Sequence, residues 1–127
     1  MEIRSLVGGS ASVCGPEATV AAAAQTMVND GIGSIGVVEH GRLIGIFTER
    51  DALRATAAGA DLSTEKVSEW MTPDPDVLSP TVEVEDAAEW LLATGYRHLP
   101  VVEDGALLGI VSIKDVLWAF DPAQQER

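Results

Sequence analysis

The sequence has very little cysteine. A single cysteine stands among 127 residues and cannot form an internal disulfide. This scarcity indicates a reducing compartment, so we expect a cytoplasmic protein. Cys14 and the two histidines, His40 and His98, have no metal-ligand spacing, so no metal site is predicted. They also form no repeated pairing of a base with a nucleophile, so we do not expect an enzyme.

Positive charge is also scarce. Eight basic residues stand against 20 acidic ones, which gives a formal net charge of −12. Such a field repels nucleic acid and anionic membrane surfaces, which bind largely through lysine and arginine. No apolar run reaches the roughly 18 residues of a membrane helix, and the first residues do not resemble a secretory signal. We therefore expect no nucleic acid and no membrane as partners, and an anionic ligand needs a local basic pocket.

The sequence does contain an internal repeat. Residues 13–55 and 77–119 align without a gap at an offset of 64 residues, and 16 of the 43 positions are identical. A fixed period of this kind marks a supersecondary unit that is used twice. Two similar units in one short chain are expected to pack about a pseudo-two-fold axis, which creates paired, equivalent clefts.

The repeat also sets the expected domain boundaries. We predict a first repeat over residues 1–58, a connector over 59–72, a second repeat over 73–120 and a frayed tail over 121–127. A chain of this length has room for one compact domain, so both repeats are expected to share it.

Each repeat predicts the order β-α-β-β-α, an α+β fold with its helices on one face of the sheet. Helical spacing of apolar residues ends at Gly31 and Gly95, where a left-handed backbone is easiest for glycine. Two β-branched runs around a glycine-containing turn then predict a β-hairpin. The second helix is expected to carry Leu53 and Leu117 inward. A short helix over residues 67–71 is echoed weakly at the start of the chain.

The densest shared motif is glycine, two apolar residues, a hydroxyl residue, two further residues and aspartate, at 45–51 and 109–115. One interpretation is a capping box, although aspartate closes such a box less well than glutamate or glutamine. The other is a ligand site, in which the helix N-terminus and the hydroxyl bind phosphate and the aspartate accepts from a vicinal diol such as ribose. The glycine would let the ligand approach the backbone. The residues given roles in this interpretation are Thr48, Arg50 and Asp51 in repeat one and Ser112, Lys114 and Asp115 in repeat two.

Together with residues 96–102 (Tyr-Arg-His-Leu-Pro-Val-Val), these motifs resemble cystathionine-β-synthase-type (CBS) repeats. The whole chain resembles a stand-alone tandem pair, a Bateman module. The resemblance covers about residues 3–120, so we expect no attached enzyme or transporter domain. It implies that the two aspartates hold ribose hydroxyls while Thr48 and Ser112 approach phosphate.

The resemblance also implies a ligand and an assembly. The expected ligand is an adenine nucleotide, AMP or ATP, with S-adenosylmethionine and NADH as alternatives, bound in clefts between the repeats. No cofactor is required, and a disc-like homodimer is expected. The adenine would lie against apolar backbone near Cys14, Ile35, Gly36 and Val37 in one repeat and Leu99 and Pro100 in the other.

The two repeats differ at the entry to the hairpin. Repeat two has Arg97 and His98 before its leucine and proline, whereas repeat one has glycine and serine at these positions. If the pseudo-two-fold axis brings Arg97 and His98 toward the first repeat's ligand, they would meet its phosphate. We therefore expect the cleft with Asp51 to bind AMP-like ligands more tightly than the cleft with Asp115.

A second functional interpretation stays open. The clefts could be empty, and the repeats could form a dimerisation or protein-interaction module. Trp90 and Trp118 are interpreted as residues of the core or of a dimer face. In the first interpretation the ligand changes the repeats and thereby a regulated partner protein, which the sequence does not name.

Overall fold

The computed structural model describes residues 1–7 and 11–120. The chain folds into two compact units, Ala11–Pro75 and the combination of Met1–Ser10 with Asp76–Arg127. We call the first the first-repeat unit and the second the second-repeat unit, and each is described by itself. The tail predicted to be frayed, 121–127, lies outside the described residues.

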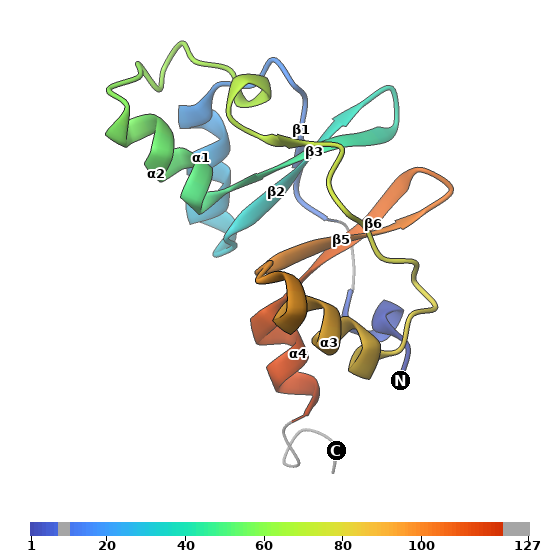
Figure 1. Ribbon diagram of the computed structural model, residues 1–127. Helices are drawn as coiled ribbons and strands as arrows, with labels where there is room; N and C mark the ends of the chain where they lie inside the picture. Colours follow the sequence, from blue (N-terminus) through green and yellow to red (C-terminus); the bar gives the residue numbers. More distant parts are fainter. Residues whose placement is uncertain (8–10, 121–127) are drawn as a thin grey trace. The chain divides into compact units, whose positions relative to one another are not determined.

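The first-repeat unit is a four-stranded sheet with two helices (Figure 1). The strand order is β1-β2-β3-β4; β1 is parallel to β2, and the other two pairs are antiparallel. The elements in chain order are β1 (Val13–Cys14), α1 (Val20–Asp30), β2 (Ser34–Glu39), β3 (Arg42–Thr48), α2 (Glu49–Ala57), the 3-10 helix η2 (Val67–Glu69) and β4 (Thr72–Pro73).

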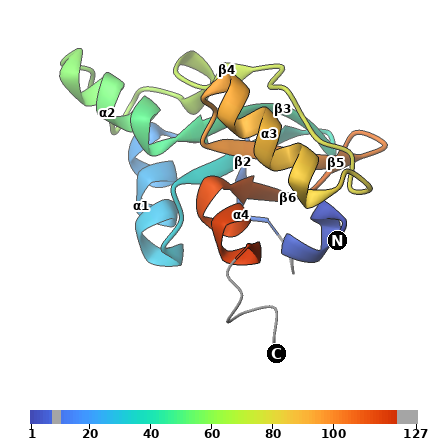
Figure 2. The same ribbon diagram turned by 60° about the horizontal axis from the view of Figure 1, so that its bottom comes forward.

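The second-repeat unit has the same plan with a smaller sheet (Figure 2). Strands β5 and β6 are antiparallel, and Leu78 makes a single parallel bridge to Val101 where the first-repeat unit has β1. Its elements are the 3-10 helix η1 (Ile3–Leu6), α3 (Val84–Thr94), β5 (His98–Glu103), β6 (Ala106–Ser112) and α4 (Ile113–Ala119). The predicted α+β class and the order β-α-β-β-α are confirmed, with the first strand of this unit reduced to one bridge.

The predicted helix ends and turns are also present. Gly31 and Gly95 follow the first helix of each unit with φ of 66° and 76°. Each hairpin turns through two residues of positive φ, His40-Gly41 and Asp104-Gly105. This is the two-residue turn whose twist matches that of the flanking strands.

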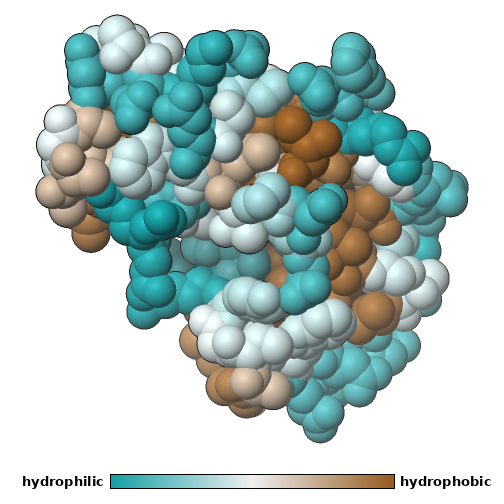
Figure 3. All heavy atoms as spheres, turned by 45° about the horizontal axis from the view of Figure 1, so that its top comes forward, coloured by the Kyte–Doolittle hydropathy of each residue, from teal (hydrophilic) through white to brown (hydrophobic). Residues whose placement is uncertain are grey.

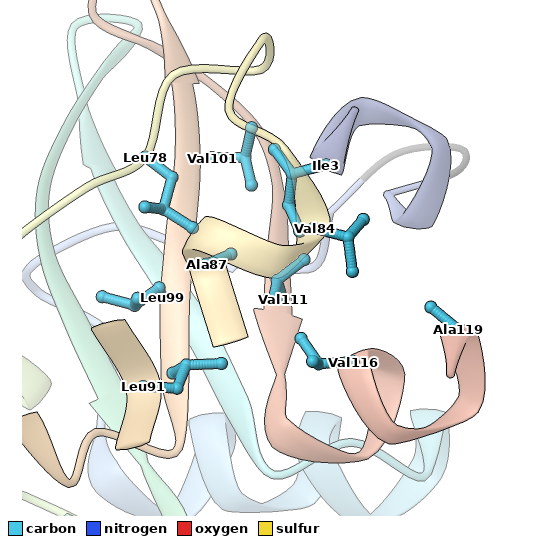
Figure 4. Close-up of a cluster of buried hydrophobic side chains, with 10 residues drawn as sticks. All are labelled: Ile3, Leu78, Val84, Ala87, Leu91, Leu99, Val101, Val111, Val116 and Ala119. Atoms are coloured by element: carbon cyan, nitrogen blue, oxygen red, sulfur yellow. The ribbon is translucent and has the colours of Figure 1, made fainter. Parts of the chain in front are cut away.

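Each unit has its own apolar core. In the second-repeat unit, Figure 4 shows Ile3 from η1 among residues of α3, β5, β6 and α4. In the first-repeat unit, Val67 from η2 takes the corresponding place. Both side chains are fully buried. Burying such a side chain contributes about 1.5–3 kcal/mol. The buried core residues of the first-repeat unit are Val20, Ala23, Met27, Ile35, Val37, Phe47, Ala55 and Val67.

Residues at the start of the chain therefore complete the core of the second-repeat unit, as residues of the connector complete the core of the first-repeat unit. The Ile3 amide donates to the Val82 carbonyl at 2.7 Å, and the Val67 amide donates to the Ala18 carbonyl at 2.8 Å. Each of these residues lies 64 positions from its counterpart, so the structural repeat begins well before residue 13. The weak echo of residues 67–71 at the start of the chain is a real structural correspondence.

The expectation that Leu53 and Leu117 point inward is wrong within these units: their exposed fractions are 68% and 64%. Helix α2 buries Asp51 and Ala55 instead, which lie one turn apart on one face. Leu53 stands two positions from each and therefore faces the other way. Figure 3 shows that apolar residues also lie on the surface of the molecule, outside the buried cores. The other matched pairs of exposed apolar residues are Val13 with Val77, Val28 with Leu92 and Ile32 with Tyr96.

Candidate ligand site at the strand-to-helix junctions

The junction between β3 and α2 holds a closed capping box. The Asp51 Oδ2 atom accepts from the Thr48 amide at 2.9 Å and from the Thr48 hydroxyl at 3.2 Å. The Asp51 amide donates back to the Thr48 hydroxyl oxygen at 3.3 Å. The Asp51 side chain is buried, with 8% of its surface exposed. Aspartate therefore closes this box despite its short side chain.

The junction between β6 and α4 repeats this geometry. The Asp115 Oδ2 atom accepts from the Ser112 amide at 2.8 Å and from its hydroxyl at 3.0 Å. The Asp115 amide donates to the Ser112 hydroxyl oxygen at 3.2 Å. Asp115 is half-buried, whereas Asp51 is buried. The capping-box interpretation thus holds in both repeats, and each junction also presents one hydroxyl and one carboxylate together.

The two junctions differ at the second carboxylate oxygen. Arg54 donates to the Asp51 Oδ1 atom at 2.9 Å, and its guanidinium carbon lies 5.8 Å from the centre of the Trp70 ring. This distance falls within the range of a cation–π interaction. Trp118 stands at the position of Arg54 in the second repeat. Among the described residues, no side chain donates to the Asp115 Oδ1 atom.

This Asp51–Arg54–Trp70 cluster was not predicted. The spacing of three residues between Asp51 and Arg54 is a helical signal that could have indicated the pair. Nothing local in the sequence connects either residue with Trp70, which lies in the connector. Its indole Nε1 is buried and, among the described residues, has no hydrogen-bond partner.

The residues predicted to line an adenine lie in the strands behind each junction. Ile35 and Val37 in β2, and Leu99 in β5, are buried in their cores, so their side chains are not accessible within each unit. Gly36 and Pro100 occupy the alternating positions, whose side-chain direction is the opposite face of the sheet, and both are buried as well. The contact of an adenine with these residues therefore stays a prediction.

Cys14 pairs with Val37 across β1 and β2 and packs against the first core. Burial raises the pKa of the Cys14 thiol above its ordinary value. Because the thiolate is the nucleophilic form, this residue is a poor nucleophile at neutral pH. The structure therefore gives it the character of a small apolar residue.

The predicted basic residues lie near their junctions with exposed side chains. Arg50, Lys114 and Arg97 make no ion pair within the described part of the chain. The Arg97 carbonyl accepts from the Ile113 amide at 3.0 Å, which places this residue beside the start of α4. His98 is half-buried and stands opposite Ser112 in the hairpin register. Within the second-repeat unit, the fold therefore brings Arg97, His98 and Ser112 together.

The role expected for the motif glycines needs correction. A Cβ at Gly45 would overlap the Met71 sulfur, and a Cβ at Gly109 would lie 2.7 Å from the Val7 Cβ atom. The space over each glycine is thus filled by the chain itself rather than open to a ligand. Met71 and Val7 are again 64 positions apart, so both glycines are explained by the packing of matching segments.

Residues 1–7 and 11–120 contain neither a metal-ligand cluster nor a membrane-spanning helix. No group of three or more metal-ligating side chains gathers there. None of the helices in these residues combines the length and the apolar character needed to cross a bilayer.

Comparison with known proteins identifies the family. The CBS domain family matches residues 9–58 and 67–121, which together form most of the chain. The chain therefore belongs to the CBS domain family and is a tandem pair of CBS domains. Its duplicated β-α-β-β-α units, each with a hydroxyl–aspartate capping box, are the two members of this pair.

Two curated relatives illustrate the similarity. An uncharacterised 17.7 kDa protein of Acidianus ambivalens is 40% identical over 107 residues, which are 83% of this chain and 64% of that protein. The CBS domain-containing protein YhcV of Bacillus subtilis is 40% identical over 102 residues, 80% of this chain and 72% of the relative. The chain thus spans somewhat less than two thirds of the Acidianus protein.

Solved structures share the fold. A CBS domain protein from Pyrobaculum aerophilum, complexed with AMP, is 25% identical with a TM-score of 0.86, and the match covers 99% of this chain and 96% of that one. The protein CBSX2, in complex with AMP, is 27% identical with a TM-score of 0.84 and covers 99% and 98% of the two chains.

Proposed function

We propose that this protein is a regulatory module that binds an adenine nucleotide and transmits its presence to a partner protein. The observation that carries the proposal is the hydroxyl–aspartate pair held at the same junction of both repeats, in a fold whose relatives are solved with AMP. A cytoplasmic location belongs to this proposal.

The proposed roles follow from the chemistry of each group. Asp51 and Asp115 accept hydrogen bonds from the ribose diol, for which each carboxylate has unused lone pairs. Thr48 and Ser112 lie beside the phosphate at the start of each helix, and Arg50, Lys114 and Arg97 supply positive charge against the overall charge of −12. The base would lie against backbone near Gly36 and Pro100, which are buried in the structure, so its binding requires these strands to become accessible.

The ligand class can be tested by thermal unfolding. We expect AMP or ATP to stabilise the protein, by about 2.7 kcal/mol at 100 times the dissociation constant, because ligand binds only the folded state. S-adenosylmethionine and NADH are the alternative ligands, and cytidine monophosphate is the control with the same sugar and phosphate but no adenine. Absence of a shift with every adenosyl compound contradicts the proposal.

The proposed residues can be tested by calorimetry. Asp51→Ala and Asp115→Ala should each weaken or abolish one class of AMP site. Asp104→Ala, in an exposed hairpin turn, is the control for loss of one negative charge. Unchanged AMP binding in both site variants would show that the nucleotide binds elsewhere.

A second candidate is a dimerisation module, and the matched exposed apolar residues favour it. Leu53 and Leu117 are exposed at the same position of each repeat, and so are Val28 and Leu92. Exposed apolar residues that form a contiguous patch mark an interaction surface. A homodimer is part of the proposal in either case. Light scattering on wild type and on a Leu53→Ser, Leu117→Ser double variant tests it, and an unchanged monomeric mass in both contradicts it.

A further inference from the structure

We propose that Arg54 is an internal competitor for the ligand at Asp51, so that it lowers the affinity of the first repeat for a ribose diol. The inference rests on the proposed function, because it assigns a specificity role within that site. Its basis is the ion pair between Arg54 and Asp51, which has no equivalent among the described residues of the second repeat.

The argument begins with the acceptor capacity of a carboxylate, about four lone-pair sites. At Asp51 three hydrogen bonds are already made, two from Thr48 to Oδ2 and one from Arg54 to Oδ1. One site is therefore left on Oδ1. A vicinal diol that donates two hydrogen bonds to this carboxylate has to displace Arg54 or give up one of its own.

The second repeat shows the same site without the competitor. Asp115 accepts two hydrogen bonds, both on Oδ2 and both from Ser112. Trp118 occupies the position of Arg54 and is 51% exposed. The acceptor capacity of Oδ1 is thus unused within the described residues. The resulting order of affinity for a diol, Asp115 above Asp51, is opposite to the order predicted from Arg97 and His98.

The competitor is held loosely enough to be displaced. The Arg54 side chain is 59% exposed, although Asp51 is only 8% exposed. Exposed ion pairs are weak, and their usual strength corresponds to about a two- to fivefold change in affinity. The contact with Trp70 at 5.8 Å keeps the guanidinium near the carboxylate and also gives it a spectroscopic reporter.

Adenosine is the appropriate probe, because it carries the diol but no phosphate that Arg54 could attract. The experiment uses Asp115→Ala as the background, so that the first-repeat site is measured alone. Arg54→Gln in this background should raise adenosine affinity about two- to fivefold. Arg42→Gln, which removes the same charge from the exposed start of β3, should leave it unchanged.

A salt titration separates competition from a structural role. Salt screens exposed ion pairs, so adenosine should bind more tightly to the Arg54 protein as salt rises. The Arg54→Gln protein should lack this dependence. A structural effect of the substitution would change the melting temperature but not this slope.

Trp70 emission gives a second measurement that needs no Asp115 variant. In a Trp90→Phe, Trp118→Phe protein, adenosine should change the emission of Trp70 as Arg54 leaves Asp51, and Arg54→Gln should abolish the change. Equal or lower adenosine affinity in Arg54→Gln than in Arg42→Gln overturns the inference while leaving the proposed function intact. Failure of both adenosine and AMP to bind any of these proteins overturns both.

Discussion

The two CBS repeats use different parts of the chain to complete one plan. The first is finished by the segment that follows it, with Val67 in the core and Met71 over Gly45. The second is finished by residues from the start of the chain, with Ile3 in the core and Val7 over Gly109. The structural unit therefore extends beyond the repeated segments 13–55 and 77–119.

Truncation of Ile3 or Val67, the core side chains supplied by these two segments, should lower stability the most. Ile3→Ala and Val67→Ala each leave a cavity in a core where the wild-type side chain is fully buried. We expect a loss of about 2–4 kcal/mol for each in urea unfolding. Glu89→Ala, at an exposed position of α3, is the control and should cost under about 0.5 kcal/mol. A neutral Ile3→Ala would show that the start of the chain does not complete the second repeat.

Substitution of the motif glycines by alanine should have the next largest effect on stability, and the two losses should be unequal. Gly109→Ala brings a Cβ to 2.7 Å from the Val7 Cβ atom, which is fixed to the backbone. Gly45→Ala meets the flexible end of Met71 and approaches the Thr72 carbonyl oxygen only to 3.0 Å. We expect a loss of about 1–3 kcal/mol for Gly109→Ala and less for Gly45→Ala. Gly15→Ala is the control, because its Cβ would meet nothing within 4 Å. Thermal and urea unfolding measure both losses. Equal losses of stability for Gly45→Ala and Gly109→Ala would contradict the expected difference between the two repeats.

The capping boxes should contribute equally in the two repeats. Thr48→Ala and Ser112→Ala each remove a hydroxyl that caps a helix, at a cost of about 1 kcal/mol. Addition of Arg54→Gln to Thr48→Ala should cost little more, since exposed ion pairs contribute under about 1 kcal/mol. Thr26→Ala, on the exposed part of α1, is a matched control. A markedly larger loss on adding Arg54→Gln would mean that Arg54 stabilises the junction rather than competes there.

The smallest expected effect concerns a titratable group present in one repeat only. Cys14 corresponds to Leu78 in the second repeat, and burial raises the pKa of its thiol from the ordinary value of 9.0. The unfolded chain loses this proton first, so stability should fall as pH rises above about 9 and through the folded-state pKa. Cys14→Ala should lose less stability over this window. Alkylation by iodoacetamide at pH 8.5 should also be slower in the folded than in the unfolded protein.

Local sequence was sufficient for the repeated elements. Helix ends at Gly31 and Gly95, the two-residue hairpin turns and the paired capping boxes are all set by residues near each other in the chain, and all are present. The family assignment also followed from such local motifs and is confirmed.

What local sequence could not show depends on distant partners. The packing of Val7 over Gly109 joins residues separated by more than a hundred positions, and the motif glycine alone suits a ligand or a side chain equally well. The contact of Arg54 with Trp70 also joins two separate segments of the chain, α2 and the connector, and no local motif indicates it. The roles of the predicted site residues in binding remain predictions, because they depend on a ligand.

The packing of residues 3–7 in the second-repeat unit has a consequence for the order of folding. In the first-repeat unit the hydrogen bond from Val67 to Ala18 spans 67 − 18 = 49 residues, whereas that from Ile3 to Val82 spans 82 − 3 = 79. The first-repeat unit is contiguous and can form on the ribosome once residue 75 has emerged, because contiguous units fold during synthesis. Residues 3–7 are made before the rest of the second-repeat unit and find their permanent neighbours only after α3, the hairpin and α4 have been made. Until then Ile3 stays exposed to water or to a chaperone.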